Sequence, residues 1–350
     1  MFNLEHLLKV LDPEPVLIDH QVCLAARHRR ATCRACIEVC PEGALRLEEG
    51  KVVVDSAKCS RCGLCAGACP TASITIRGID DAAVAGAAQL HCSRAQGLGV
   101  QVPCLGYLTV DHLLAIGLRH DLVELTRGDC ASCQWQSGGA MTERTVETAR
   151  QTLGAIGSEH TLRLVGRVAG EAGDRAISRR DLFNLWRVES VQVARQFAPE
   201  KEVNHAKLPA KLPARRRRWL RQANPDRAQP GATMPTGPWK GRVVSEACNG
   251  CSICVSFCPT GAFAQRETEG DWLLTHQPAA CVACNTCVAL CPTRAVSEEP
   301  LPAVRMLQGE VRTVVRLSTL RCRTCRKEFK GRPDESQCPQ CRSVLGMLKI

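Results

Sequence analysis

Cysteine is the residue type in this sequence whose number and spacing could do chemistry. The chain of 350 residues contains 24 cysteines, which fall into four groups separated by stretches without cysteine. Closely spaced thiolates are ligands for zinc and for iron–sulfur clusters, whereas disulfide frameworks are typical of short secreted chains. The spacing therefore predicts metal centres. The groups span residues 23–69, 92–133, 248–291 and 322–341.

The third group has the most complete pattern. "CNGCSICVSFCP" and "CVACNTCVALCP" each have the spacing Cys-x2-Cys-x2-Cys-x3-Cys-Pro, which resembles the doubled motif of bacterial-type ferredoxins with two [4Fe–4S] clusters. In that motif the fourth cysteine of each copy crosses to the other cluster. Zinc is the alternative metal, although zinc sites use pairs of cysteines. The predicted ligand sets are Cys248, Cys251, Cys254 and Cys291 for one cluster, and Cys258, Cys281, Cys284 and Cys287 for the other.

The first group repeats this plan with one cysteine missing. "CSRCGLCAGACP" is complete, but "RHRRATCRACIEVCP" has Arg30 where the first cysteine is expected, and arginine cannot bind iron. We expect Cys23 to fold back as the fourth ligand. The alternatives are a [3Fe–4S] cluster on three cysteines, His28 or another group as ligand, or no cluster. The predicted sets are Cys23, Cys33, Cys36 and Cys69, and Cys40, Cys59, Cys62 and Cys65.

The second group lies in a region that alternates between strand and helix patterns. Strands are predicted at 100–106, 121–130 and 160–166, and helices at 109–120, with Thr109 or Asp111 as the N-cap, and at 142–157. This alternation is typical of α/β folds, which place their sites at the carboxyl ends of strands. The cysteines there are Cys92, Cys104, Cys130 and Cys133.

Residues 86–168 resemble the iron–sulfur delta subunit of hydrogenases that work with heterodisulfide reductase (F420-non-reducing hydrogenases). The resemblance rests on "PCLG", "GDC" and the "CQWQSGG" stretch, with the helix and strand that follow. It implies a [2Fe–2S] cluster on the four cysteines and electron relay to a flavin-containing reductase. The sequence departs from the family in having Cys92 alone near the start, and Cys130 closer to Cys133. A four-iron cluster or zinc is the alternative.

The last group has the spacing of a zinc ribbon. Two Cys-x2-Cys pairs separated by twelve residues suit the tetrahedral tetrathiolate of structural zinc. Rubredoxin-type iron is the alternative. A segment this short needs the metal to fold. The predicted zinc ligands are Cys322, Cys325, Cys338 and Cys341.

The elements that must hold the ferredoxin-like motifs are also visible. Hairpins are predicted at 44–55 and 261–276, and a closing strand at 72–76. The expected fold is a multidomain α+β and α/β chain. Its predicted domains are 1–80 (first ferredoxin), 84–170 (central α/β iron–sulfur domain), 171–242 (a helix and a basic linker), 243–300 (second ferredoxin) and 305–350 (zinc ribbon).

Charge is concentrated in one segment. Residues 201–242 contain eleven Lys or Arg, two acids and six prolines, which predicts an extended linker after a helix capped by Ser178. Anionic metal centres would offset much of the formal net charge of +11. The N-terminus lacks a signal-peptide pattern, and no apolar run reaches the length of a membrane span. We therefore expect a cytoplasmic protein.

No nucleotide-binding motif was found in the sequence. We predict a non-catalytic iron–sulfur electron-transfer subunit with four [4Fe–4S] clusters, one [2Fe–2S] cluster and zinc. It would relay single electrons between a partner flavoprotein or hydrogenase-like enzyme and a terminal reductase. One alternative is a redox-responsive nucleic-acid-binding protein that uses the arginine-rich segment. Another is a self-contained reductase acting at the incomplete cluster.

Overall fold

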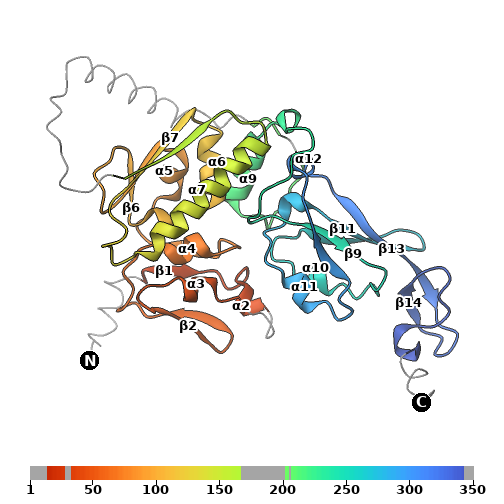
Figure 1. Ribbon diagram of the computed structural model, residues 1–350. Coiled ribbons are helices and arrows are strands. Elements are labelled where there is room, and N and C mark those ends of the chain that lie inside the picture. Colours follow the sequence, from red (N-terminus) through yellow and green to blue (C-terminus); the bar gives the residue numbers. More distant parts are fainter. Residues whose placement is uncertain (1–13, 28–32, 167–201, 205, 343–350) are drawn as a thin grey trace, which may run out of the picture. The chain divides into compact units, whose positions relative to one another are not determined.

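The computed structural model describes residues 14–27, 33–166, 202–204 and 206–342, which form two compact units (Figure 1). Unit 1 comprises the residues up to 205 together with 213–229, and unit 2 comprises 206–212 together with 230–350. The chain thus contributes a short segment to unit 2 and returns to unit 1 before unit 2 is completed. The helix expected from Ser178 lies outside the described residues.

The first part of unit 1 consists of two antiparallel strand pairs and three short helices. The hairpin and closing strand expected from the sequence are present, and the closing strand β4 pairs with an unexpected strand, β1. Glu49 and Gly50 have φ of 48° and 78°, the positive values that a tight two-residue hairpin turn requires. The elements are β1 Val16–Ile18, α2 Leu24–Arg27, α3 Ala35–Glu38, β2 Leu45–Glu48, β3 Lys51–Val54, α4 Leu64–Ala68 and β4 Ile74–Ile76.

A four-stranded parallel sheet with the order β6-β5-β7-β8 follows in the same unit (Figure 1). The sequence predicted three of its strands and the helices α6 and α7, but not β5 or α5. Thr109 caps α6 by accepting a hydrogen bond from the backbone N–H of His112. The elements are α5 Asp81–Gly86, β5 Gln89–Cys92, β6 Val100–Val102, η1 Leu105–Tyr107, α6 Val110–Gly117, β7 Leu122–Arg127, α7 Ser137–Ala155 and β8 Thr161–Gly166.

The arginine-rich segment forms helix α9 (Ala214–Gln222), which packs against α6. This differs from the extended linker that the charge and prolines predicted. The physical reason is an apolar face formed by Trp219 and Leu220, both buried. The Trp219 indole also donates a hydrogen bond to Asp111 of α6 (Nε1–Oδ1 2.8 Å), so the helix gains polar contacts in the same interface. A short 3-10 helix, η2 (Pro225–Arg227), follows it.

Unit 2 repeats the ferredoxin plan. Strands β10 and β11 form the predicted hairpin, and β9 pairs with β12 at the other side of the motif. The elements are β9 Gly241–Val244, α10 Ile253–Ser256, β10 Phe263–Glu267, β11 Asp271–His276, η3 Pro278–Ala280, α11 Thr286–Leu290, β12 Val296–Glu299, α12 Ala303–Gln308, β13 Arg312–Arg321 and β14 Glu328–Gly331.

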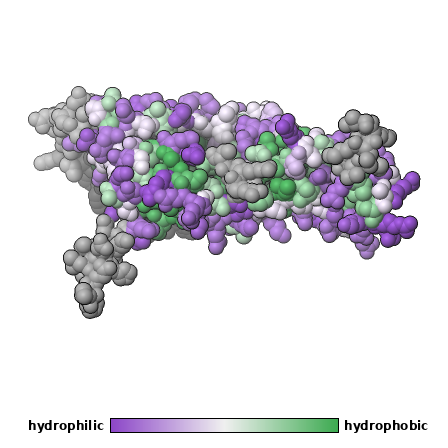
Figure 2. Space-filling model, turned by 90° about the horizontal axis from the view of Figure 1, so that it is seen from below, coloured by the Kyte–Doolittle hydropathy of each residue, from purple (hydrophilic) through white to green (hydrophobic). Residues whose placement is uncertain are grey.

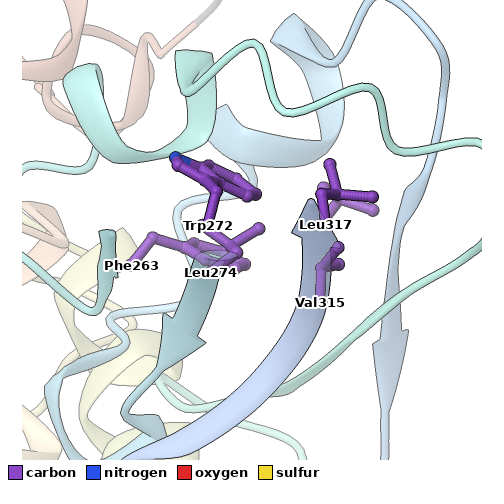
Figure 3. Packing of buried hydrophobic residues seen from close by; sticks show 6 residues of the cluster. Phe263, Trp272, Leu274, Val315 and Leu317 are labelled. Atoms are coloured by element: carbon purple, nitrogen blue, oxygen red, sulfur yellow. The ribbon is translucent and has the colours of Figure 1, made fainter. Parts of the chain in front are cut away.

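Strand β13 joins the hairpin to the C-terminal cysteine-rich segment, because it pairs with β11 on one side and with β14 on the other. Its residues Leu317 and Val315 lie opposite Trp272 and Leu274 of β11, and the four side chains belong to one apolar cluster (Figure 3). The segment expected to be a separate zinc ribbon therefore shares a four-stranded sheet with the second ferredoxin motif.

Hydrophilic residues predominate on the molecular face seen in Figure 2, with hydrophobic residues gathered in patches among them. Exposed large hydrophobics come from different elements, such as Leu47 of β2 and Leu122 of β7. Among the helices that the structure describes, none combines the length and the apolar character needed to cross a bilayer.

Candidate iron–sulfur and metal sites

The incomplete first motif is completed in space by a fourth thiol. Cys33, Cys36 and Cys69 line one cavity, and Cys23 lines it with them. Burial, followed by the three neighbouring thiols, raises the pKa of Cys36 to about 12. A thiol that resists ionisation, crowded by three others, is suited to a metal centre, which supplies the compensating positive charge.

The turn from β1 into α2 brings Cys23 to this cavity. The Cys23 N–H donates to the carbonyl oxygen of Asp19 (3.0 Å), and the thiol is buried. The sequence predicted that Cys23 folds back as the fourth ligand, and the structure places it beside its three expected partners. Arg30 and His28 lie outside the described residues.

The second thiol set of unit 1 gathers around α4. Burial, followed by the nearby Cys40 and Cys59, raises the pKa of Cys62. Burial also raises the pKa of Cys65. Among the neighbouring thiols that add to this shift, Cys62 has the largest effect, and Cys36 of the first set has the next largest. The structure therefore brings Cys40 from the first motif to the three cysteines of the second, and it places the two sets next to each other.

The two motifs of unit 2 interleave in the same way. Burial and then neighbouring thiols raise the pKa of Cys248, and Cys291 from the other motif is among those neighbours. Cys258 likewise raises the pKa of the buried Cys281 in the opposite motif, although burial is the larger cause. Each crossing cysteine therefore lies beside the thiols to which the sequence assigned it.

The four crossing cysteines share one backbone contact. Each Sγ accepts a hydrogen bond from the N–H of the residue four positions later, where the chain turns after the Cys-Pro step. Hydrogen bonds to cluster sulfur are one of the features that set reduction potentials. The donor and acceptor pairs are Ala44 and Cys40 (3.3 Å), Ser73 and Cys69 (3.3 Å), Ala262 and Cys258 (3.2 Å), and Ala295 and Cys291 (3.2 Å).

A buried arginine, which the sequence analysis missed, faces one thiol set of unit 2. Arg242 of β9 is 2% exposed and donates from Nη2 to Asn285 Oδ1 (2.6 Å). Burial opposes its charge, but Cys281, Cys287 and Glu298 together raise its pKa. A buried cation beside four thiols fits an anionic cluster. In the sequence, Arg242 counted only as the last charge of the basic linker.

The central thiol set forms at the carboxyl ends of three parallel strands. Cys92 ends β5, Cys104 follows β6, and Cys130 follows β7. Burial raises the pKa of Cys104 to about 12, and Cys92, Cys62 and Cys130 are the thiols that add to the shift. Cys133 in turn is a neighbour that raises the pKa of Cys130. The set lies at the edge of the sheet where α/β folds place their sites.

Backbone groups and glycines surround this central set. N–H groups of Gly128, Gly106 and Trp135 donate to Cys92 (3.3 Å), Cys104 (3.4 Å) and Cys133 (3.4 Å), respectively. At the start of α7, a Cβ on Gly138 would lie 2.5 Å from Cys104 Sγ, and one on Gly139 would lie 2.7 Å from Cys130 Cβ. The helix can therefore approach the thiols this closely only with glycine at both positions, which explains the "QSGG" stretch.

The histidine in α6 has a structural place near this set. His112 is buried, and its Nε2 is 2.9 Å from Asp81 Oδ1. Tyr107 of η1 donates its hydroxyl to the same oxygen (2.6 Å). The network ties η1 to α5 and α6, and so fixes the loop that carries Cys104.

The C-terminal thiols form a group that could hold one metal ion. The Sγ atoms of all four cysteines lie within 4.8 Å of one another, and Cys325 and Cys338 are 3.8 Å apart. Backbone N–H groups of Cys325 and Cys338 lower the pKa of Cys322 to about 6. A thiol that ionises easily, in a group of four ligands that leaves no open coordination position, fits a structural metal. The group consists of Cys322, Cys325, Cys338 and Cys341.

Comparison with known proteins identifies the two ferredoxin regions. Residues 29–73 and residues 247–296 each match the family of 4Fe-4S dicluster domains. Neither match reaches residues 86–168, so the resemblance of that region to the delta subunit stays a prediction.

Two curated relatives have similar sequences over short stretches. One is a component of the ion-translocating oxidoreductase complex of Methanosarcina acetivorans, 40% identical over 45 residues, which are 13% of this chain and 17% of the relative. The other is an uncharacterized ferredoxin of Methanocaldococcus jannaschii, 45% identical over 42 residues, which are 12% of this chain and 28% of the relative. The chain thus spans only a small part of either relative. The protein contains two 4Fe-4S dicluster ferredoxin domains.

Proposed function

We propose that the protein is an electron-transfer subunit that relays single electrons between a partner flavoprotein or hydrogenase-like enzyme and a terminal reductase. One observation carries this proposal: all 24 cysteines lie in described residues and gather into six sets of four. No thiol is left over for a nucleophile or a disulfide. Such an arrangement serves the storage and transfer of electrons rather than substrate chemistry.

The cofactor assignment follows from the sets. We assign a [4Fe–4S] cluster to each of the four sets in the two dicluster domains, with Cys23 as the fourth ligand beside Cys33. We assign a [2Fe–2S] cluster to the set that contains Cys104, and zinc to the set that contains Cys322. Iron–sulfur clusters take up and release one electron at a time. The chain's own residues hold them and, through N–H donors and Arg242, adjust their potentials.

The partner classes rest on two likenesses. The Methanosarcina relative is named as part of an oxidoreductase complex, and the central domain resembles a hydrogenase delta subunit. Both support a protein that works inside a redox complex. The nucleic-acid alternative is weakened by α9, because Arg216 is buried against Asp111 and the other arginines of its run, Arg215, Arg217 and Arg218, are only partly exposed.

The test is anaerobic purification followed by metal analysis and capture of partners. We expect iron and sulfide for four four-iron clusters and one two-iron cluster, together with one zinc ion per chain. A flavoprotein or hydrogenase-like subunit should be captured from anaerobic lysate and should reduce the clusters. Protein whose ferredoxin motifs contain only zinc, or protein with intact clusters that no captured redox partner reduces, would overturn the proposal.

A further inference from the structure

The first ferredoxin motif and the central domain are in direct contact inside unit 1. Helix α4 packs against both α3 and η1. Helix α4 carries Cys65, and η1 directly follows Cys104. The second thiol set of unit 1 (Cys40, Cys59, Cys62 and Cys65), called the middle set below, therefore lies between the other two sets of this unit.

Where α4 and η1 come closest, there is no room for a Cβ atom on either of two glycines. A Cβ on Gly67 of α4 would lie 2.0 Å from the carbonyl oxygen of Gly106, a distance that real Cβ atoms do not reach. A Cβ on Gly106 would in turn lie 2.4 Å from the side chain of Leu64. Two glycines at this crossing therefore let the backbones that carry the middle and central thiols touch.

A polar contact fixes the same interface from the other end. The indole of Trp135, two residues after Cys133, donates to the hydroxyl of Ser60 (3.1 Å), the neighbour of Cys59. Residues of both thiol-bearing loops thus meet at two separate points. Their relative position is set by packing and by a hydrogen bond, so the distance between the two sets is fixed.

We infer that unit 1 holds one linear relay of three centres, in which the α4–η1 glycine contact fixes the step from the middle centre to the central one. This inference rests on the proposed function. The two ends of the relay are the set with Cys23 and the set with Cys130. One electron would pass at each step: the cluster that gives it up would be oxidised by one electron, the next would be reduced by one, and no proton or bond would be transferred.

The geometry also assigns the outer end of the relay. The loop with Cys130 and Cys133 has exposed residues, among them Ala131 and Ser132, and lies at the edge of the parallel sheet. An external one-electron carrier can approach the central centre there. Because tunnelling slows exponentially with distance, the middle set is a required step between this edge and the set with Cys23.

The experiment uses the full-length protein, reduced with dithionite, and measures microwave power saturation of each centre by EPR. We expect the central centre to relax faster while the middle centre is paramagnetic, and the double variant Cys59→Ala/Cys62→Ala, which leaves too few thiols for a middle cluster, to abolish this enhancement. Cys251→Ala, which removes a ligand in unit 2, is the matched control and should leave it unchanged. A central signal that saturates identically in the wild type and in Cys59→Ala/Cys62→Ala overturns the relay.

A second pair of variants tests the glycine contact itself. Gly67→Ala forces α4 and η1 apart, whereas Gly154→Ala in α7 meets nothing within 4 Å. With iron content intact, we expect Gly67→Ala to lose the relaxation enhancement and Gly154→Ala to keep it; equal enhancement in both overturns the inference. If Gly67→Ala loses iron, Trp135→Phe replaces it and decides by the same criterion. Wild-type protein without iron in the central set would also overturn the relay, whereas ferredoxin motifs that contain only zinc would refute the proposed function instead.

Discussion

Arg216 of α9 donates from Nε to Oδ1 of Asp111 in α6 at 2.5 Å, across 105 positions of sequence. The arginine is fully buried, and Trp219 donates to the same carboxylate oxygen. Arg216, which the sequence analysis placed in an extended linker, is thus part of a packed interface. This pair holds the arginine-rich helix on the domain that carries the central thiol set.

Neutralising the buried carboxylate should destabilise unit 1. Asp111→Asn breaks the buried ion pair with Arg216, which costs about 3–5 kcal/mol in comparable pairs. The measurement is thermal unfolding followed by circular dichroism under anaerobic conditions. Glu143→Gln, which breaks a more exposed pair with Arg127, is the control and should cost about 0–1 kcal/mol. Equal melting temperatures in the two variants would show that the Asp111 pair is not structural.

Removing the Cys23 thiol should change one cluster only. Cys23→Ala leaves three thiols in the cavity, so we expect a three-iron signal in EPR, or loss of one four-iron cluster with the iron content reduced to match. Cys254→Ala in unit 2 serves as comparison and should affect a different signal. The assignment of Cys23 is wrong if the variant keeps every four-iron cluster and shows no three-iron signal.

Removing the buried cation of unit 2 should lower one reduction potential. The reduced centre carries one more negative charge than the oxidised one, so Arg242 stabilises the reduced form. For Arg242→Met we expect a downward shift on the order of 60 mV, equivalent to about 1.4 kcal/mol for one electron. EPR-monitored redox titration measures it. Arg316→Met removes an exposed arginine of β13, whose charge solvent screens, and should leave the potential unchanged. Identical titrations for the two variants would contradict the assigned role.

The C-terminal thiols should bind one zinc ion that stabilises strand β14. Cys325→Ala breaks the tetrathiolate, so we expect loss of one zinc ion per chain and proteolytic cleavage near 322–341, since a segment this short folds only with its metal. Zinc analysis and limited proteolysis measure these effects. Cys284→Ala should lose iron but keep zinc. A Cys325→Ala protein that retains its zinc would refute the site.

Unit 2 should lose stability at mildly acidic pH through His276. Burial, followed by Arg242 and Arg305, lowers the pKa of this histidine to about 3. Its stabilising contribution is complete above the unfolded pKa of about 6.5 and is lost as the pH falls toward about 3. We expect the unfolding free energy to fall by about 2 kcal/mol between about pH 7.5 and about pH 5. In His276→Phe, which keeps a ring beside Phe263, this part of the pH dependence should disappear; denaturant titrations at both pH values measure it.

The sequence predicted the features that depend on neighbouring residues. The Cys-x2-Cys-x2-Cys-x3-Cys-Pro spacing, the hairpin at Glu49–Gly50 and the capped helix after Thr109 are all set by short-range geometry and backbone preferences. Both dicluster domains could therefore be recognised from spacing alone. Strand β1 and helix α5 were missed because each is short and has little periodicity of its own.

The tertiary structure decided which distant residues meet. It places Cys23 in the cavity where Arg30 left a ligand open, buries Arg242 against a thiol set, and joins the C-terminal segment to the second ferredoxin sheet through β13. These outcomes depend on how faces of separate elements pack. The type of a charged or apolar residue does not reveal which distant residue it will contact. The sequence by itself determined the chemistry of the thiols; packing determined which thiols and charges stand together.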